Sequence, residues 1–316
     1  MSFSPLPLLG PHIAVLLGSA GAFFGIQQLT HRFGPSCSKS WNGFDDRIKN
    51  GVASHVVSMA HALIIIPLAL HAVKSDILAR DPVFGYDRFV GNVLAISSGY
   101  FIWDTIDSLR YSTLGFVVHG ACCLAVYLFS FRPFLAGFGP PFLLWELSTP
   151  LLNIHWFMDK LGLSTTYPTF FLINALAFML VFFLARIVYG GYESMVFFHV
   201  MWTRRHEIPL HLHLIYCIGN LSLNALNWLW FSKMVKKMLA RVSGDDKPVS
   251  ESKRAARTNK MSPSEKQSLL EVSTPTSVSE DKMESTNGRQ FKQTLSLPAD
   301  PPSPNVSTSR KTSEGW

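Results

Sequence analysis

Residues 52–72, VASHVVSMAHALIIIPLALHA, form an apolar run long enough to cross a bilayer, yet the run contains Ser54, Ser58 and His61. These three residues are spaced i, i+4 and i+7, so in a helix they share one face. A polar group in the hydrocarbon core is costly unless it faces the interior of a helix bundle. This stretch therefore predicts a membrane helix that turns a polar face toward a chamber between helices.

The composition of the whole chain agrees with this interpretation. Of the 316 residues 48% are hydrophobic and only 16% are charged, with a mean hydropathy of +0.21, which is unusual for a soluble protein. We therefore predict an all-α polytopic membrane protein with about seven transmembrane helices that enclose a polar interior chamber. The expected spans are residues 12–29, 52–72, 89–108, 114–131, 134–154, 168–189 and 210–232.

Two of these spans contain interruptions, so six or eight spans are also compatible with the sequence. Asp104 and Asp107 interrupt the third span. Pro140, Pro141 and Glu146 interrupt the fifth, which is typical of a kinked or re-entrant helix.

Charge gives the expected orientation. Lysine and arginine cluster after the first and the last span, and the positive-inside bias places both of these flanks in the cytosol. With seven spans, the N-terminus lies on the opposite side and the C-terminus is cytosolic. The basic residues lie at membrane borders and form no clustered basic face, so we expect no nucleic-acid partner.

The organisation along the chain has three expected parts. Residues 1–40 contain an N-terminal membrane anchor helix and a loop, and residues 41–240 contain about six further transmembrane helices. Residues 241–316 are rich in Ser, Thr, Pro, Lys and Glu, which predicts a disordered cytosolic tail. The Ser-Pro and Thr-Pro pairs of the tail fit phosphorylation and cytosolic partners, and an unregulated solvated tail fits them equally.

Polar residues recur at helical spacing in the other predicted spans. The third span carries Ser97, Tyr100, Asp104 and Asp107, the fourth His119, the fifth Glu146, Thr149 and Asn153, the sixth Arg186, and the seventh His213, Cys217, Asn220, Asn224 and Asn227.

Each group has a structural and a functional interpretation. The asparagine row fits interhelical hydrogen bonding as well as ligand binding. His61 and His119 are either structural donors or proton-transfer groups. Glu146 either pairs with Arg186 or handles a substrate. The two aspartates either mark a helix end or supply carboxylates that are paired, protonated or hydrated.

The order of several landmarks resembles the TLC domain, which is shared by the translocating-chain-associating membrane protein, the ceramide synthases and CLN-type lipid proteins. The landmarks are Trp41-Asn42, Ser58 with His61, Gly99-Tyr100-Phe101 with Asp104, Val118-His119-Gly120, Glu146-Leu147-Ser148-Thr149-Pro150 with Asn153, and Arg186. The nearest type is the TLC domain-containing proteins of unassigned biochemistry. Ceramide synthases are more distant, because they carry two adjacent histidines where this chain has His119-Gly120.

The resemblance implies a multi-pass protein of the endoplasmic-reticulum membrane that acts in lipid, or sphingolipid and ceramide, homeostasis. If it is an enzyme, the implied reaction is N-acyl transfer with acyl-coenzyme A as co-substrate and no bound cofactor or metal. The expected catalytic residues are His119, Glu146 and Asp104. The expected substrate-binding residues are Ser58, His61, Asp107, Asn153, Arg186, His213, Asn220 and Asn224.

The expected partners are membrane lipids, namely a sphingoid base, a ceramide or an acyl chain. An alternative function is that of a non-catalytic lipid sensor or cargo-escort protein of the endoplasmic reticulum. A zinc-dependent intramembrane amidase ranks lower, because no His-x-x-x-His pair places two histidines on one helical face.

Overall fold

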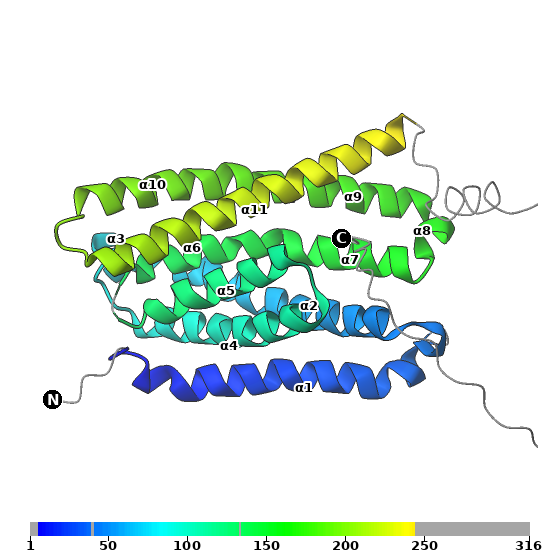
Figure 1. The fold of residues 1–316 in the computed structure, drawn as a ribbon, viewed down its shortest axis with the longest axis horizontal. Coiled ribbons are helices and arrows are strands. Elements are labelled where there is room, and N and C mark those ends of the chain that lie inside the picture. Colours follow the sequence, from blue (N-terminus) through cyan, green and yellow to red (C-terminus); the bar gives the residue numbers. More distant parts are fainter. Residues whose placement is uncertain (1–5, 39–40, 133, 244–316) are drawn as a thin grey trace, which may run out of the picture. The chain divides into compact units, whose positions relative to one another are not determined.

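The computed structural model describes residues 6–38, 41–132 and 134–243, and every regular element within them is a helix (Figure 1). The compact helical unit ends at Met238, and a second unit begins at Leu239. Residues from 244 onward lie outside the described residues, so disorder and phosphorylation of the tail stay predictions.

Long helical rods make up the unit. Four of the rods are single helices that follow one another from the N-terminal side: α1 (Ile13–Cys37), α2 (Asp46–Ala72), α4 (Arg88–Tyr111) and α5 (Leu114–Phe129). Two further rods are composite: α6 (Gly139–Leu143), η4 (Leu144–Ser148) and α7 (Thr149–Lys160) form one, and α9 (Pro168–Phe182), η5 (Phe183–Tyr189) and α10 (Gly190–Thr203) form the other. The last rod is α11 (Leu210–Val242). Short elements connect the rods: η1 (Gly10–His12), η2 (Trp41–Gly43), α3 (Asp76–Arg80), η3 (Ala136–Phe138) and α8 (Leu163–Thr166).

Six of the seven predicted spans coincide largely with these rods, and the fifth, 134–154, also includes two non-helical residues and the short helix η3 ahead of α6. Among the described residues, the helices at Gly10–Cys37, Asp46–Ala72 and Pro168–Thr203 are long and apolar enough to cross a membrane. The all-helical membrane class is therefore confirmed, whereas seven crossings stay a prediction. The sixth rod is longer than predicted, because the helix continues through η5 and α10 to Thr203.

The helix starts follow local sequence rules. Asp45 precedes α2 and its Oδ1 accepts a 2.7 Å hydrogen bond from the Ile48 backbone N–H. Asp87 does the same for α4 through the Phe89 N–H at 2.8 Å. These carboxylates satisfy backbone donors that have no partner inside the helix. Pro168 begins α9, where a missing N–H costs nothing.

The N-terminal helix packs closely along α4 and α2 (Figure 1). Gly99 of α4 permits this approach, since a Cβ atom there would lie 2.6 Å from the Leu16 carbonyl oxygen and 2.7 Å from the Ala20 nitrogen of α1. Backbone atoms cannot rotate away as a side chain can. The glycine therefore fixes how near α1 lies to the rest of the bundle.

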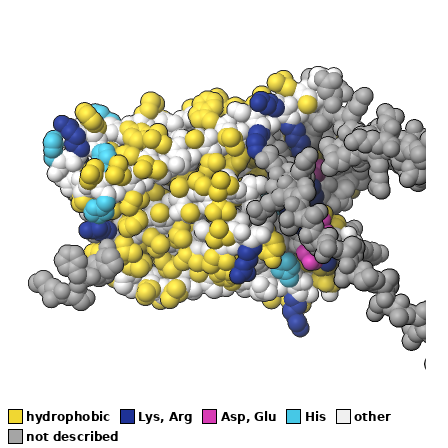
Figure 2. Space-filling model, viewed as in Figure 1, with side chains coloured by type: hydrophobic (Ala, Val, Ile, Leu, Met, Phe, Trp, Pro, Cys, Tyr) yellow, Lys and Arg dark blue, Asp and Glu magenta, His cyan; other side chains and the backbone are white. Residues whose placement is uncertain are grey.

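The surface has the pattern of a protein surrounded by lipid. Figure 2 shows hydrophobic side chains over the middle of the visible face, with Lys, Arg and His side chains toward its two ends. Large apolar side chains that are more than half exposed occur on many rods, including Leu17, Leu63, Leu172, Leu180 and Leu221. Exposed apolar surface on this scale is typical of a membrane or partner interface.

Candidate functional site

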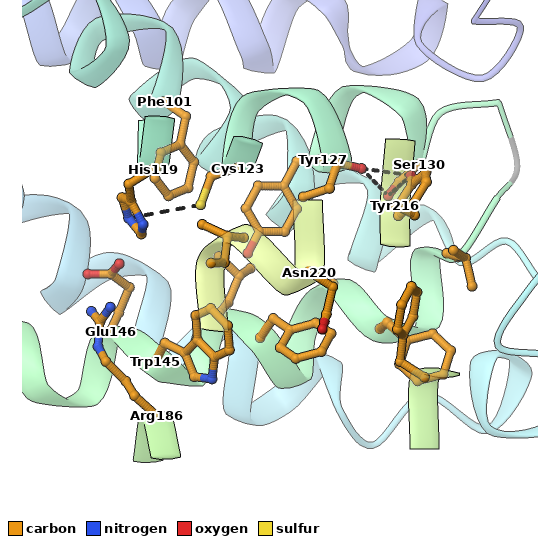
Figure 3. A pocket seen from close by; sticks show the side chains of 18 residues that line it. Phe101, His119, Cys123, Tyr127, Ser130, Trp145, Glu146, Arg186, Tyr216 and Asn220 are labelled. Atoms are coloured by element: carbon orange, nitrogen blue, oxygen red, sulfur yellow. Dashed lines mark hydrogen bonds between the residues drawn. The ribbon is translucent and has the colours of Figure 1, made fainter. Parts of the chain in front are cut away.

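A cavity of about 50 Å³ lies between α4, α5, α6, η4, η5, α10 and α11. His119, Glu146 and Arg186 line one end, and Ser130 and Tyr216 line the other (Figure 3). Most of the lining between these ends is aromatic or aliphatic. The cavity therefore has an apolar middle with a charged cluster at one end only.

Glu146 enters this cluster from an irregular stretch of its rod. It lies in the 3₁₀ segment η4, between α6 and α7, and is 7% exposed. Thr149 Oγ1 donates a 2.7 Å hydrogen bond to Glu146 Oε2. Pro150 follows in the first turn of α7, where it is tolerated because the first N–H groups of a helix are unpaired. The Glu-x-x-Thr-Pro pattern thus builds a helix start that presents a carboxylate inward.

Arg186 reaches the cluster from the π-helical segment η5 and is 7% exposed. Its Nε donates to Ser148 Oγ at 3.0 Å, and its Nη1 donates to Asn227 Oδ1 at 3.4 Å. Its guanidinium group also lies 5.3 Å from the centre of the Phe182 ring. π-Helical segments often occur at functional sites.

Glu146 and Arg186 interact electrostatically, and their side chains extend toward one another in Figure 3. Within the described part of the chain, no direct ion pair joins them. Uncharged partners hold each side chain instead: Thr149 bonds to Glu146, and Ser148 and Asn227 bond to Arg186. Both charged side chains line the cavity.

His119 of α5 completes the cluster. Its Nε2 lies 3.9 Å from the Cys123 Sγ one helical turn later, and both residues line the cavity. Its ring packs edge-on against Phe101 and Trp230, with centroids 6.0 and 5.5 Å apart. Figure 3 shows the imidazole on the same side of the cavity as Glu146. An imidazole and a carboxylate at one end of an apolar cavity can exchange a proton with a bound ligand.

His61 of α2 does not line the cavity, although it is a neighbour of Glu146. It is fully buried and stacks on Tyr100, with ring centroids 3.8 Å apart and planes 2° apart. Among the described residues neither of its ring nitrogens has a hydrogen-bond partner, although it interacts electrostatically with Glu146. Its position makes it a neighbour of the charged cluster and not a direct contact to a ligand.

The two aspartates of α4 have different surroundings. Asp107 accepts hydrogen bonds from Gln27 Nε2 at 2.7 Å, Asn50 Nδ2 at 3.0 Å and Ser54 Oγ at 2.7 Å. This network joins α1, α2 and α4 away from the cavity. Asp104 packs against α5, where a Cβ atom at Gly120 would lie 2.6 Å from its Oδ2.

Ser58 and Asn153 meet in a third polar group at the interface between α2 and α7. Asn153 is fully buried, and its Oδ1 accepts from Ser58 Oγ at 3.0 Å and from His55 Nδ1 at 2.7 Å. The His55 ring stacks on Trp156 with centroids 4.2 Å apart. Neither Ser58 nor Asn153 lines the cavity.

The asparagines of α11 have different surroundings, and two of them form the expected interhelical hydrogen bonds. Asn220 lines the cavity, Asn227 holds Arg186, and Asn224 Nδ2 donates to Ser194 Oγ at 2.9 Å. His213, at the start of α11, does not line the cavity. Of the expected site residues, the structure therefore gathers His119, Glu146, Arg186 and Asn220 around one space.

Several residues of these clusters were not expected from the sequence. His55 precedes Ser58 by three positions, so the two share a helical face, and this spacing could have indicated that His55 belongs to the same polar group. Gln27 is a polar residue in an apolar span, and Cys123 lies one turn after His119. Nothing in the pattern around Tyr216 indicated its place at the end of the cavity.

No group of three or more His, Cys, Asp or Glu side chains that could hold a metal ion occurs within the described ranges. His61, His119 and His213 lie in three different environments. The zinc amidase hypothesis therefore has no ligand set in this part of the chain.

Comparison with known proteins identifies the family. The sequence model of the TLC domain family matches residues 52–236, which make up more than half of the chain. This chain belongs to the TLC domain family. An uncharacterized TLC domain-containing protein of Schizosaccharomyces pombe is 34% identical over 77% of this chain and 84% of its own length.

Two further relatives each match more than half of this chain. Topoisomerase I damage affected protein 4 of Saccharomyces cerevisiae is 34% identical over 62% of this chain and 73% of its own length. Human TLC domain-containing protein 4 is 29% identical over 70% of this chain and 88% of its own length. No solved structure matches the chain significantly. The charged cluster lies inside the TLC domain, since His119, Glu146 and Arg186 all fall within the matched residues.

Proposed function

We propose that this TLC protein binds an acyl lipid in the cavity and changes the lipid composition of the endoplasmic-reticulum membrane by N-acyl transfer from acyl-coenzyme A. One observation carries the proposal: an imidazole, a carboxylate and a guanidinium group meet at one end of an otherwise apolar cavity. Such a cavity accepts a hydrocarbon chain and holds its carbonyl group beside groups that can move a proton.

The proposed step joins an amine to the acyl group. The amine nitrogen of a long-chain base attacks the thioester carbonyl carbon, so a C–N bond forms and the C–S bond to coenzyme A breaks. His119 accepts the proton that the amine loses, and the departing sulfur takes up that proton as the thiol. The positive charge of Arg186 lies nearby to stabilise negative charge that develops on the carbonyl oxygen. Glu146 orients the amine.

A specific observation favours a second candidate, a non-catalytic lipid sensor. Glu146 and Arg186 are already hydrogen-bonded within the fold, to Thr149 and to Ser148 and Asn227, respectively. Charges fixed in this way can recognise a headgroup without taking part in chemistry. The C-terminal tail would then recruit cytosolic partners.

One experiment separates the two candidates. Cells from which the gene is deleted are complemented with the wild-type chain, His119→Ala or His213→Ala, and their lipids are compared by mass spectrometry. The purified proteins are also assayed with acyl-coenzyme A and a long-chain base. His213→Ala is the matched control, because that histidine does not line the cavity.

The transferase is supported if the wild type and His213→Ala restore the lipid profile and form an N-acyl product while His119→Ala does neither. If all three chains restore the profile equally and none forms product, the transferase is wrong and the sensor is favoured. If neither the lipid profile nor any product depends on the wild-type chain, a role in lipid homeostasis is contradicted.

A further inference from the structure

We infer that the cavity receives one unbranched acyl chain and that Tyr216, at its far end, sets the longest chain that fits. This inference rests on the proposed function in one respect only, the use of this cavity for an acyl group. It adds the number and shape of the chains that the cavity holds and a residue that determines chain length.

The shape of the cavity favours a single chain. Its volume is about 50 Å³, and its lining residues extend from the charged cluster to Tyr216 (Figure 3). His119 and Ser130 both line it and are eleven positions apart along α5 and its C-cap, which corresponds to about 16 Å of helix. A cavity this long and this small in volume is narrow. It suits a chain one methylene wide and excludes a ring system or a second chain.

The residues that line the cavity indicate in which direction the acyl chain lies. Between the two ends, aromatic and aliphatic side chains such as Tyr127, Phe142 and Leu143 face the cavity. The charged groups His119, Glu146 and Arg186 are confined to one end. The carbonyl end of a bound acyl group therefore lies at the charged cluster, and its methyl end points toward Tyr216.

Several contacts hold Tyr216 in place at the end of the cavity opposite the charged cluster. Its side chain is 6% exposed, and its hydroxyl group donates to the Val126 carbonyl oxygen at 2.8 Å and lies 3.3 Å from the Phe134 carbonyl oxygen. Ser130 Oγ is 3.4 Å away, and the Phe134 ring packs edge-on at 5.0 Å. These contacts join α11 to the end of α5 and to the segment that follows it. The ring cannot move aside without breaking them.

The adjacent turn is equally fixed. Leu135 lines the cavity and directly follows Phe134, whose ring contacts Tyr216. Its φ is 56°, the left-handed conformation that non-glycine residues rarely adopt. Its N–H donates to the Val83 carbonyl oxygen at 2.6 Å, and its side chain is 1% exposed. A strained residue held in place at a cavity wall often marks a functional constraint. Tyr216 and Leu135 together form a rigid end wall.

The test measures which chain lengths bind to the purified full-length protein. Octanoate, laurate, palmitate and stearate compete with a fluorescent fatty acid, which gives an affinity for each length without requiring turnover. The variants are Tyr216→Ala, which removes the end wall, and Tyr216→Phe, which keeps the ring. Ile218→Ala is the matched control, because Ile218 lies on the same helix and is 59% exposed.

Leu135→Gly provides a second way to open the same wall. Glycine adopts a positive φ without strain, so this variant removes the side chain while it relieves the backbone. It therefore tests the wall even if Tyr216→Ala fails to fold.

We expect the wild type and Ile218→Ala to prefer the same chain length, and Tyr216→Phe to stay close to it, because the ring that remains still packs against Phe134. Each newly buried methylene strengthens binding roughly fourfold, so Tyr216→Ala and Leu135→Gly should shift the preference toward longer chains by at least about tenfold. If both opened variants bind the acids but keep the wild-type preference, this inference is wrong and the proposed function stands. If no acid competes even with the wild type, acyl binding in this cavity is wrong and both proposals fail.

Discussion

Arg186 and Ser148 join two composite rods by a 3.0 Å hydrogen bond from the guanidinium Nε to the hydroxyl oxygen. Arg186 lies on a π-helical segment and Ser148 at the end of a 3₁₀ segment, so both partners come from irregular turns. The departure from regular α-helix in each rod brings the charged end of the cavity together.

This contact makes a stability prediction for Arg186→Met. The substitution removes the hydrogen bonds that Arg186 donates to Ser148 and Asn227, and it leaves the buried Glu146 without the positive charge that interacts with it. A buried charge left without compensation typically costs about 3 kcal/mol. We expect a clearly lower thermal midpoint in detergent. Arg205→Met is the control, since Arg205 is exposed and donates to the Trp202 carbonyl oxygen of its own helix end. Equal midpoints for the two variants would contradict the structural role of Arg186.

Asp107 makes a second stability prediction. Asp107→Ala removes the carboxylate that accepts hydrogen bonds from Gln27, Asn50 and Ser54, and the loss of these three bonds to a charged group should cost about 3 kcal/mol. Thermal unfolding in detergent measures the loss. Asp46→Ala serves as the control, because the Asp46 side chain is 98% exposed and its effect should stay near 0.5 kcal/mol. A loss for Asp107→Ala no larger than that of the control would argue against the network.

Gly99 and Gly21 predict opposite effects of the same substitution. Gly99→Ala places a Cβ atom 2.6 Å from the Leu16 carbonyl oxygen, so α1 must shift and stability should fall by about 2 kcal/mol. Gly21 lies in α1 with open space around its Cα, so Gly21→Ala should stabilise the helix by about 0.5 kcal/mol. The two variants are compared by thermal unfolding. If Gly99→Ala is as stable as the wild type or more stable, α1 does not lie as close to α4 as the structure has it.

Asp81 and Arg204 predict how stability depends on pH outside the spans. Partial burial tends to raise the pKa of the Asp81 carboxyl group, but hydrogen bonds from the Phe84 N–H and from Arg204 hold that pKa below its usual value. Arg204 likewise lowers the pKa of Glu207, through hydrogen bonds to its carboxylate. A carboxyl group with a lowered pKa stabilises the fold above its unfolded pKa, and this stability is lost as the pH falls through the folded pKa.

We therefore expect the thermal midpoint of the wild type to fall below about pH 4 more steeply than that of Arg204→Gln. Arg205→Gln should follow the wild type. Midpoints measured from about pH 7 to about pH 3 in one detergent check this. Parallel curves for all three chains would mean that these ion pairs contribute nothing to stability.

Much of the arrangement follows from the sequence, because membrane helices obey simple constraints. The lengths of the apolar runs predicted where the long helices lie, and the cost of polar groups in lipid predicted that His119, Glu146 and Asn220 face the interior, where they line the cavity. For Arg186 the sequence left open whether the side chain extends to the membrane surface or pairs with an acid. The role of each in chemistry stays a prediction.

The remaining features depend on contacts between distant residues. Gln27 and Asp107 are 80 positions apart, so periodicity within one span could not pair them. No pattern in the local sequence indicated the π-helical segment that carries Arg186. Asp104 and Asp107 share a helical face by spacing, yet one packs on α5 and the other joins the network with α1 and α2.

The contact between Gln27 and Asp107 also shows where the folding unit begins. The family match starts at residue 52, but the helix that supplies Gln27 and covers Gly99 lies before it, as does Asn50. A chain cut to residues 52–236 would expose the α4 face that α1 now covers and would leave a buried carboxylate with Ser54 as its remaining donor from this network. The region recognisable as the family is therefore smaller than the region that folds, and protein prepared for biochemistry must retain the first helix.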